Sequence, residues 1–302
     1  MTTPHYDILI VGSGPTGLGA AARLAQHHRN FPSPSLPTYL LIDQAPSAGG
    51  LACTDVTPEG FLFDLGGHVI FSHFQFFDDL IDSACSASSF NTHQRVSYVW
   101  MKDRWIPYPF QNNITCLDPD DQIKCLNGLI AAKGNTSSSF ANFDEWINKV
   151  MGPGINDIFM RPYNFKVWAY PTTEMQCSWL GERVATANVE KAVENVLLKK
   201  EEGGWGPNAV FRFPKRGGTG GIWKNVAHKC IPQENQQYSK AMTGIDIEAK
   251  IVTLADGSKI SYGKLLSTIP LDLTLRMVSF EVLYLLFSTL SDARPCPAIT
   301  TK

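Results

Sequence analysis

Apolar runs and helix-forming stretches alternate at the start of this chain. Ile8–Val11 is a short, fully apolar run, which suits a strand buried on both faces of a parallel sheet. Leu18–Gln26 is rich in Ala and Leu and therefore favours a helix, and Tyr39–Ile42 is a second apolar run. The three segments predict a β-α-β unit, whose proline-containing link at residues 31–38 is expected at the surface.

The pattern changes between about residues 72 and 195 and returns to mixed strands and helices from about residue 209. The middle predicts a mainly helical insertion, with helices expected at Gln75–Ala84, Asp120–Ala132, Asn142–Met151 and Asn188–Leu198. After residue 209 a helix is expected at Ile222–Cys230, following the glycine-rich stretch Lys215–Gly221. Strands are expected at Val210–Phe213, Lys250–Leu254, Lys259–Tyr262 and Lys264–Ile269, with a hairpin turn at Ala255-Asp256-Gly257.

These patterns predict the α/β class, with a Rossmann-like dinucleotide-binding domain, a mainly helical inserted substrate domain and a partial β-sheet domain. The expected boundaries are 1–72 with 209–278 for the discontinuous Rossmann-like domain and its part of the sheet domain, 73–208 for the insertion, and 279–302 for a divergent tail.

Composition and charge exclude several classes of partner. The 302 residues are 44% hydrophobic and 18% charged with a net charge of -2, which is ordinary for a globular protein of one or two domains and gives no basic stripe for nucleic acid. The sequence has no apolar run of about 18 residues and no basic, apolar leader, so we expect neither a membrane-spanning segment nor a secretory signal. The seven cysteines have no metal-site spacing, which predicts reduced thiols in a cytoplasmic protein without a metal.

The sequence Gly12-x-Gly14-x-x-Gly17 lies between the first strand and the first helix. In a dinucleotide-binding loop Gly12 permits the tight turn, Gly14 lets a pyrophosphate approach the backbone, and Gly17 lets the helix pack on the strand. The helix start, with Pro15 and Thr16, offers free N–H groups to the phosphates. A glycine-rich structural turn is the alternative.

Three shorter features follow. Asp43 ends the second strand and can accept a hydrogen bond from a ribose hydroxyl; an acid there disfavours a 2′-phosphate, so FAD or NAD is expected. Gly49-Gly50-Leu51 allows backbone to lie flat against a cofactor, and a plain loop is an equal alternative. Gly66-Gly67-His68 suits close packing on a flat cofactor, although a lone histidine is more often structural.

Two aromatic and amide-rich stretches occur in the insertion, Trp105–Asn113 and Met160–Trp168. Aromatic rings can stack on a base, amides can read its edge, and Arg161 suits a diphosphate through its planar donors. Spacing alone favours an ordinary aromatic core between helices.

Taken together, these residues resemble those of one family. The glycine sets resemble the flavin-binding residues of amine oxidase-like flavoproteins. From about residue 6 to 276 the chain is similar to UDP-galactopyranose mutases of fungi and related eukaryotes, most clearly at Val56–Phe61, Gly66–His73, Pro107–Asn113, Phe159–Trp168, Trp179–Val184 and Trp205–Asn208.

The resemblance implies an FAD-dependent isomerase of galactofuranose biosynthesis, which interconverts UDP-galactopyranose and UDP-galactofuranose through a reduced-flavin N5–sugar adduct, with NADPH as the reductant. It also allows that the protein forms a homo-oligomer. The FAD site it implies comprises Gly12, Gly14, Pro15, Thr16, Gly17, Asp43, Gly49, Gly50, Leu51, Gly66, Gly67 and His68. The catalytic residues it implies are His68, Arg183 and Asn208, and the substrate site adds Phe71, Arg95, Tyr108, Gln111, Asn164 and Trp168.

Chains of this family continue beyond the length seen here and supply a further arginine and two tyrosines for the diphosphate. The resemblance fades near Arg276, so we expect a C-terminally truncated chain, in which the truncation can abolish activity. The alternative is a genuine tail that packs on the core. Two other functions stay open: an amine oxidase-like oxidoreductase, and a non-catalytic remnant that binds flavin or nucleotide.

Overall fold

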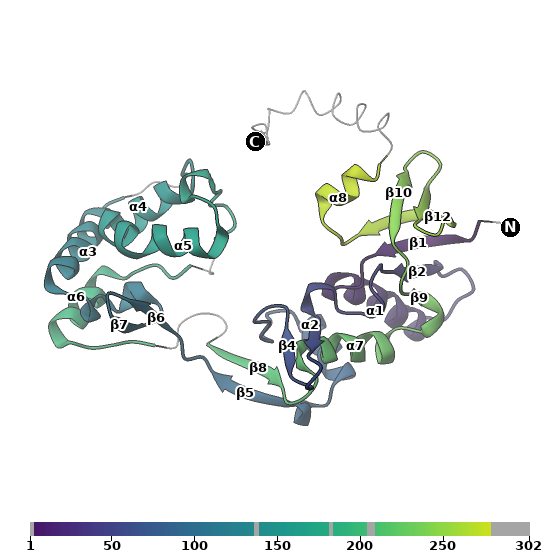
Figure 1. The fold of residues 1–302 in the computed structure, drawn as a ribbon, viewed down its shortest axis with the longest axis horizontal. Coiled ribbons are helices and arrows are strands. Elements are labelled where there is room, and N and C mark those ends of the chain that lie inside the picture. The colour runs from purple at the N-terminus through teal and green to yellow at the C-terminus, as the bar shows by residue number, and fades with distance from the viewer. Residues whose placement is uncertain (1–2, 136–138, 181–183, 204–208, 279–302) are drawn as a thin grey trace. The chain divides into compact units, whose positions relative to one another are not determined.

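The computed structural model describes residues 3–135, 139–180, 184–203 and 209–278 (Figure 1). The chain packs as two compact units, one formed by Met1–Asn91 with Arg212–Lys302 and the other by Thr92–Phe211. The expected catalytic residues Arg183 and Asn208, and the expected tail 279–302, lie outside the described residues. None of the helices in the described ranges is both long and apolar enough to cross a membrane.

A six-stranded sheet forms the centre of the first unit. Its order is β10-β11-β12-β1-β2-β9, and β1 (His5–Val11) runs parallel to both β2 (Tyr39–Ile42) and β12 (Lys259–Ser267). The short β9 (Gln236–Gln237) extends the parallel part, whereas β10 (Met242–Asp246) and β11 (Ile251–Leu254) pair antiparallel. The β-α-β unit predicted from the first 42 residues is therefore confirmed.

Both faces of this sheet are covered. Ile10 and Leu41 point to one face and pack with α1 (Pro15–Asn30), α2 (Gln75–Ala84) and α7 (Gly218–Cys230). Side chains alternate across a strand, so the neighbouring residues of β1 and β2 face the other side, where they pack with the apolar residues of β10–β12 and with Met277 beyond α8 (Leu271–Arg276). Figure 1 shows α1 and α7 on one side of the sheet and α8 toward the other.

The sequence predicted separate strands at Lys259–Tyr262 and Lys264–Ile269, but the structure joins them in β12. Gly263 explains the continuity, because a Cβ atom there would lie 2.7 Å from the backbone oxygen of Asp7 in β1. The absence of a side chain lets the two strands stay paired past the glycine, and β12 then contacts β11 with its first half and β1 along its length.

Helix α2 packs in the first unit, against α7. Its buried Leu80 and Ile81 join the core that contains Ile222 and Val226. The compact unit thus extends to Asn91 rather than ending near residue 72. Two small sheets complete the connections: β3 (Thr54–Val56) pairs with β4 (Leu62–Asp64), and β5 (Phe90–Gln94) pairs with β8 (Val210–Pro214).

The second unit is mainly helical. It contains the hairpin β6 (Tyr98–Met101)–β7 (Arg104–Pro107), followed by α3 (Pro119–Ala132), α4 (Phe143–Ile155), a π-helical turn at Asn156–Met160, α5 (Arg161–Trp168) and α6 (Val189–Leu198). The helices expected in this region are present with similar limits. Helix α3 crosses α4 closely because Gly152 lies against Gly128, where a Cβ on Gly152 would come within 2.3 Å of backbone.

Candidate dinucleotide-binding site

The glycine loop after β1 makes a tight turn for which each glycine has its own reason. Gly12 has φ +103°, and a Cβ there would lie 2.4 Å from Oγ1 of Thr268. At Gly17 a Cβ would lie 1.9 Å from the carbonyl oxygen of Gly12, so only glycine lets α1 approach the strand. Gly14 has room for a Cβ, whose nearest neighbour would be Gly50 at 3.9 Å. The chain's own packing therefore does not require a glycine at this position.

Helix α1 begins with its amide groups open. Gly14 is the N-cap and provides no side-chain hydrogen bond, and no acidic residue lies in the first turn. Pro15 stands at the helix start, where its missing N–H costs nothing, and the exposed Thr16 follows. An uncapped helix start carries unsatisfied N–H groups and a partial positive charge, which suits an anion.

Asp43 joins the end of β2 to the glycine loop. Its Oδ2 accepts hydrogen bonds from the N–H of Ser13 at 2.5 Å and from the Ser13 hydroxyl at 2.7 Å. Its Oδ1 accepts from the N–H of Ala45 at 2.8 Å. A carboxylate has about four acceptor positions, so three serve the protein and one remains for a ligand. The buried Ser13 was not singled out from the sequence, because nothing local marks a serine inside such a loop.

Gly49 and Gly50 form a second glycine turn that lies against the first. Gly49 has φ +133° and donates its N–H to the carbonyl oxygen of Ser13 at 3.0 Å. A Cβ on Gly50 would lie 2.8 Å from Cα of Gly14. Gly50 is therefore a glycine because it packs on Gly14, and contact of this turn with a cofactor stays a prediction; the neighbouring Leu51 is 81% exposed.

The segment Gly66-Gly67-His68 is an exposed loop that follows β4. The N–H of His68 donates to the carbonyl oxygen of Gly66 at 2.8 Å, and the imidazole folds back over Gly66, where a Cβ would meet its Cε1 at 3.1 Å. Phe71, beyond the loop, packs edge-on against His73 with ring centres 6.0 Å apart. The loop thus belongs to the same unit as both glycine turns.

The second unit holds the expected substrate residues other than Phe71 that the structure describes. Tyr108 lies near Arg95 and Tyr163, whose ring centre is 6.5 Å from its own, and burial raises the pKa of Tyr108. Arg95 donates from Nε to the Ser97 hydroxyl at 3.2 Å. Trp168 is 51% exposed and meets Trp179 edge-on. These aromatic side chains are partly open to a ligand.

Two amides expected to read a base are buried and already bonded to the chain. Gln111 donates from Nε2 to the carbonyl oxygen of Ala185, and Asn164 donates from Nδ2 to that of Met160 at 2.7 Å. Oε1 of Gln111 has no partner among the described residues. Around them Phe110, Phe159 and Tyr163 stack in series, so the aromatic-core interpretation holds for these rings.

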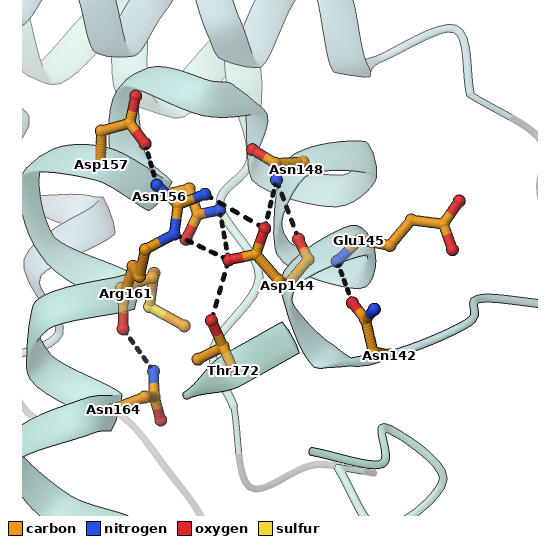
Figure 2. A network of polar contacts seen from close by, with 10 residues as sticks. Asn142, Asp144, Glu145, Asn148, Asn156, Asp157, Arg161, Asn164 and Thr172 are labelled. Atoms are coloured by element: carbon orange, nitrogen blue, oxygen red, sulfur yellow. Dashed lines mark hydrogen bonds and ion pairs between the residues drawn. The ribbon is translucent and has the colours of Figure 1, made fainter. Parts of the chain in front are cut away.

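Arg161, whose planar donors suit a diphosphate, is already paired with carboxylates of the second unit. Its Nε and Nη2 donate to Asp144 at 2.9 and 3.1 Å, and Nη1 donates to Asp157 (Figure 2). The Asp144 carboxylate also accepts from Asn156 and Thr172, and the Arg161 guanidinium, against the opposing effect of burial, lowers its pKa to about 2. Arg161 is therefore used to hold the π-helical turn between α4 and α5. Sequence reasoning missed Asp144, because its partners lie up to 28 positions away.

The sheet order and the glycine loop define the class: this is a Rossmann-like dinucleotide-binding fold. A family model described as NAD(P)-binding Rossmann-like domain matches residues 10–80. Over 95% of its length the chain is similar to a protein whose crystal structure is that of reduced UDP-galactopyranose mutase, with 42% identity and a TM-score of 0.85, and it covers 61% of that protein.

Two more distant solved structures share the fold. A putative protoporphyrinogen oxidase from Exiguobacterium sp. 255-15 has 17% identity and a TM-score of 0.62, with 92% of this chain and 62% of that one covered. A putrescine oxidase variant has 14% identity and a TM-score of 0.57, with 91% and 60% covered. The chain spans about three fifths of each of these proteins, and identities this low support the fold alone.

Proposed function

We propose that this chain binds FAD at its glycine turns and belongs to a UDP-galactopyranose mutase of the fungal and eukaryotic type, which interconverts UDP-galactopyranose and UDP-galactofuranose. The 42% identity to a UDP-galactopyranose mutase across 95% of the chain carries the proposal. The lower-identity oxidases support only the shared fold, so an oxidoreductase has less in its favour.

The residues around the glycine loop fit a dinucleotide. The uncapped start of α1 suits a pyrophosphate, and Gly14 is a glycine although the protein itself leaves room for a Cβ there. Asp43 retains an acceptor position for a ribose hydroxyl after its bonds to Ser13 and Ala45. FAD in its reduced form, with NADPH as the reductant, would supply the nucleophile for the anomeric carbon of the sugar.

The chain's own residues would bind and orient the substrate. His68, on its exposed loop in the first unit, would stand beside the flavin, with Phe71 as a further wall. Arg95, in the second unit, would contact the substrate by resemblance. Tyr108 and Gln111 would contact the uracil, and the side-chain oxygen of Gln111 would face the base N–H because the Gln111 amide group already donates to the backbone. Asn164 and Trp168 would lie nearby in the substrate site. Arg183 and Asn208, by resemblance, would contact the diphosphate and the galactose.

Two measurements test the proposal. The purified chain, incubated with FAD and desalted, should show flavin absorption, and Gly50→Ala should weaken FAD binding at least tenfold because its Cβ collides with Gly14. Gly134→Ala is the matched control, since a Cβ there meets nothing within 4 Å. A colourless wild-type chain contradicts the FAD site.

The second measurement concerns the reaction. Dithionite-reduced protein is mixed with UDP-galactofuranose, and the products are separated by chromatography. A mutase yields UDP-galactopyranose. Conversion no greater than in a boiled sample, from protein that does hold FAD, removes the mutase activity while leaving the flavin site.

A further inference from the structure

The glycine-rich start of α7 is a sequence feature to which the proposed function gives no role. The helix begins at Gly218 (φ +61°), after its N-cap Gly217 (φ +78°), and no acidic residue lies in its first turn. A helix start without its own acceptors needs them from elsewhere in the fold. Its acceptors come from the β3–β4 hairpin, more than 150 positions earlier in the chain.

Thr54 and Asp64 supply these acceptors together. Oδ1 of Asp64 accepts a hydrogen bond from the N–H of Thr219 at 3.0 Å, and Oγ1 of Thr54 accepts from the N–H of Gly220 at 2.8 Å. The Thr54 hydroxyl in turn donates to Oδ1 of Asp64. We call this four-residue arrangement the α7 cap. Its carboxylate also faces the positive end of the helix dipole, which strengthens the contact.

The glycines of α7 are there because the cap is so close. A Cβ on Gly218 would lie 2.3 Å from Oγ1 of Thr54 and 2.5 Å from Oδ1 of Asp64. On Gly220 it would lie 2.5 Å from the backbone nitrogen of Thr54, which cannot move as a side-chain tip can. Any other residue at these two positions would push the hairpin away from the helix.

The α7 cap lies at the start of residues 65–70, which we call the His68 loop. Asp64 is the last residue of β4, and the next N–H, that of Leu65, donates to the carbonyl oxygen of Cys53 at 3.2 Å. At the far end of the loop Ile70 exchanges two backbone hydrogen bonds with Arg212, at 3.0 and 2.9 Å. One continuous segment, residues 212–220, therefore holds both ends of the loop that carries His68.

The same hairpin reaches the glycine turns. The N–H of Cys53, next to Thr54, donates to the carbonyl oxygen of Gly50 at 3.3 Å, and Gly50 lies against Gly14. A displacement of Thr54 would thus move both the glycine turns and the His68 loop.

We propose that Thr54 and Asp64 are positioning residues, which act through the α7 cap to hold His68 in place relative to the glycine turns. The inference deepens the proposed function, because it takes His68 to stand beside the flavin. Neither residue needs to touch the cofactor for this effect.

The experiment compares Thr54→Val with Thr54→Ser and Asp64→Ala with Asp256→Ala. Serine keeps the hydroxyl and valine keeps the shape without it. Asp256 is an exposed residue in the turn before β12, and its carboxylate accepts from Lys240 at 2.7 Å and from Ser258, both of which lie outside the β3–β4 hairpin and α7. Hydrogen–deuterium exchange of the peptide spanning residues 65–70 is measured without FAD, together with that of β1.

Thr54→Val and Asp64→Ala should raise exchange in residues 65–70 at least tenfold while leaving β1 within twofold of the wild type, and Thr54→Ser and Asp256→Ala should stay within twofold throughout. Gly220→Ala, which displaces Thr54 by a different route, should reproduce the effect and keeps the test decisive if Thr54→Val does not fold. Equal exchange in the serine and valine variants, or a uniform rise that includes β1, overturns the proposal.

A flavin-dependent readout completes the test. In protein that holds FAD, Thr54→Val should change the visible spectrum of the bound flavin and lower kcat at least tenfold with KM changed less than threefold, and Thr54→Ser should restore both. If the wild type binds no FAD the proposed function fails, whereas the exchange measurement still decides whether the α7 cap holds the loop. Unchanged spectrum and kcat in Thr54→Val, in a protein with a mobile loop, would contradict the positioning role.

Discussion

The carboxylate of Asp43 accepts two hydrogen bonds from Ser13, one from its backbone N–H and one from its hydroxyl. These bonds fasten the end of β2 to the loop that follows β1. The residue expected to contact a ribose is thus also part of the framework of the site.

Asp43→Asn should destabilise the protein. An asparagine presents an NH2 group to donors on one side, so at least one of the bonds to Ser13 or Ala45 is lost in a partly buried place, at a cost of about 1–3 kcal/mol. Asp7→Asn is the matched control, because Asp7 accepts from the N–H and hydroxyl of Thr38 at 2.8 Å each in an exposed position. Urea unfolding followed by tryptophan fluorescence measures both; an equal loss in the two variants would contradict the structural role of Asp43.

Gly17→Ala and Gly19→Ala should have opposite effects although they lie in the same turn of α1. A Cβ at Gly17 would lie 1.9 Å from the Gly12 carbonyl oxygen, whereas one at Gly19 meets nothing within 4 Å. Overpacking at Gly17 should lower the free energy of unfolding by about 1–3 kcal/mol or more, and Gly19→Ala should raise it by about 0.5–1 kcal/mol through helix propensity. Paired denaturant titrations check the signs, and a destabilised Gly19→Ala protein would be inconsistent with an open site there.

The second unit should lose stability in acid through Asp144. Its folded pKa of about 2 lies below the ordinary value of 3.8, so the ionised form is favoured by folding. This stabilisation is fully present above about pH 4 and is lost as pH falls toward 2, and a shift of this size corresponds to about 2 kcal/mol.

Asp144→Asn should flatten that part of the pH profile. Its free energy of unfolding is measured from pH 5 to pH 2 beside that of the wild type, by fluorescence of the tryptophans. The two curves should differ most above pH 4 and converge toward pH 2. Parallel curves would mean that another group causes the acid loss.

Two thiols of the second unit, the buried Cys125 and the half-buried Cys116, should resist alkylation. Burial raises the pKa of Cys125 to about 12 and, with the nearby Glu201 as a smaller cause, that of Cys116 to about 11. At pH 8 less than about one thiol in a hundred is then the reactive thiolate. Mass spectrometry after brief iodoacetamide treatment should find both unmodified in the native protein and both modified in urea; rapid native modification would show that these sites open easily.

Elements formed by residues close together in the chain could be predicted from the sequence. The order of β1, the glycine loop, α1 and β2 follows from short apolar runs, helix-forming residues and the spacing of Gly12, Gly14 and Gly17, all of which are local. The split of β12 into two predicted strands shows where local reasoning fails, because Gly263 interrupts the apolar pattern but fits against Asp7.

Contacts between residues far apart in the chain could not be predicted from the sequence. The bonds of Asp144 to Arg161 and Thr172 cannot be read from periodicity, and Arg161 therefore looked available for a diphosphate. The placement of Thr268 over Gly12 depends on β12 running parallel to β1.

The sequence by itself determined that a strand, a glycine loop and a helix form a dinucleotide-binding turn, since those residues are neighbours and their conformations are set by local sterics and hydrophobic period. The tertiary structure alone decided that Gly50 lies on Gly14 and that Asp64 caps α7. Such contacts depend on how distant elements pack, and a buried acceptor shows its purpose only when its donor has been brought to it.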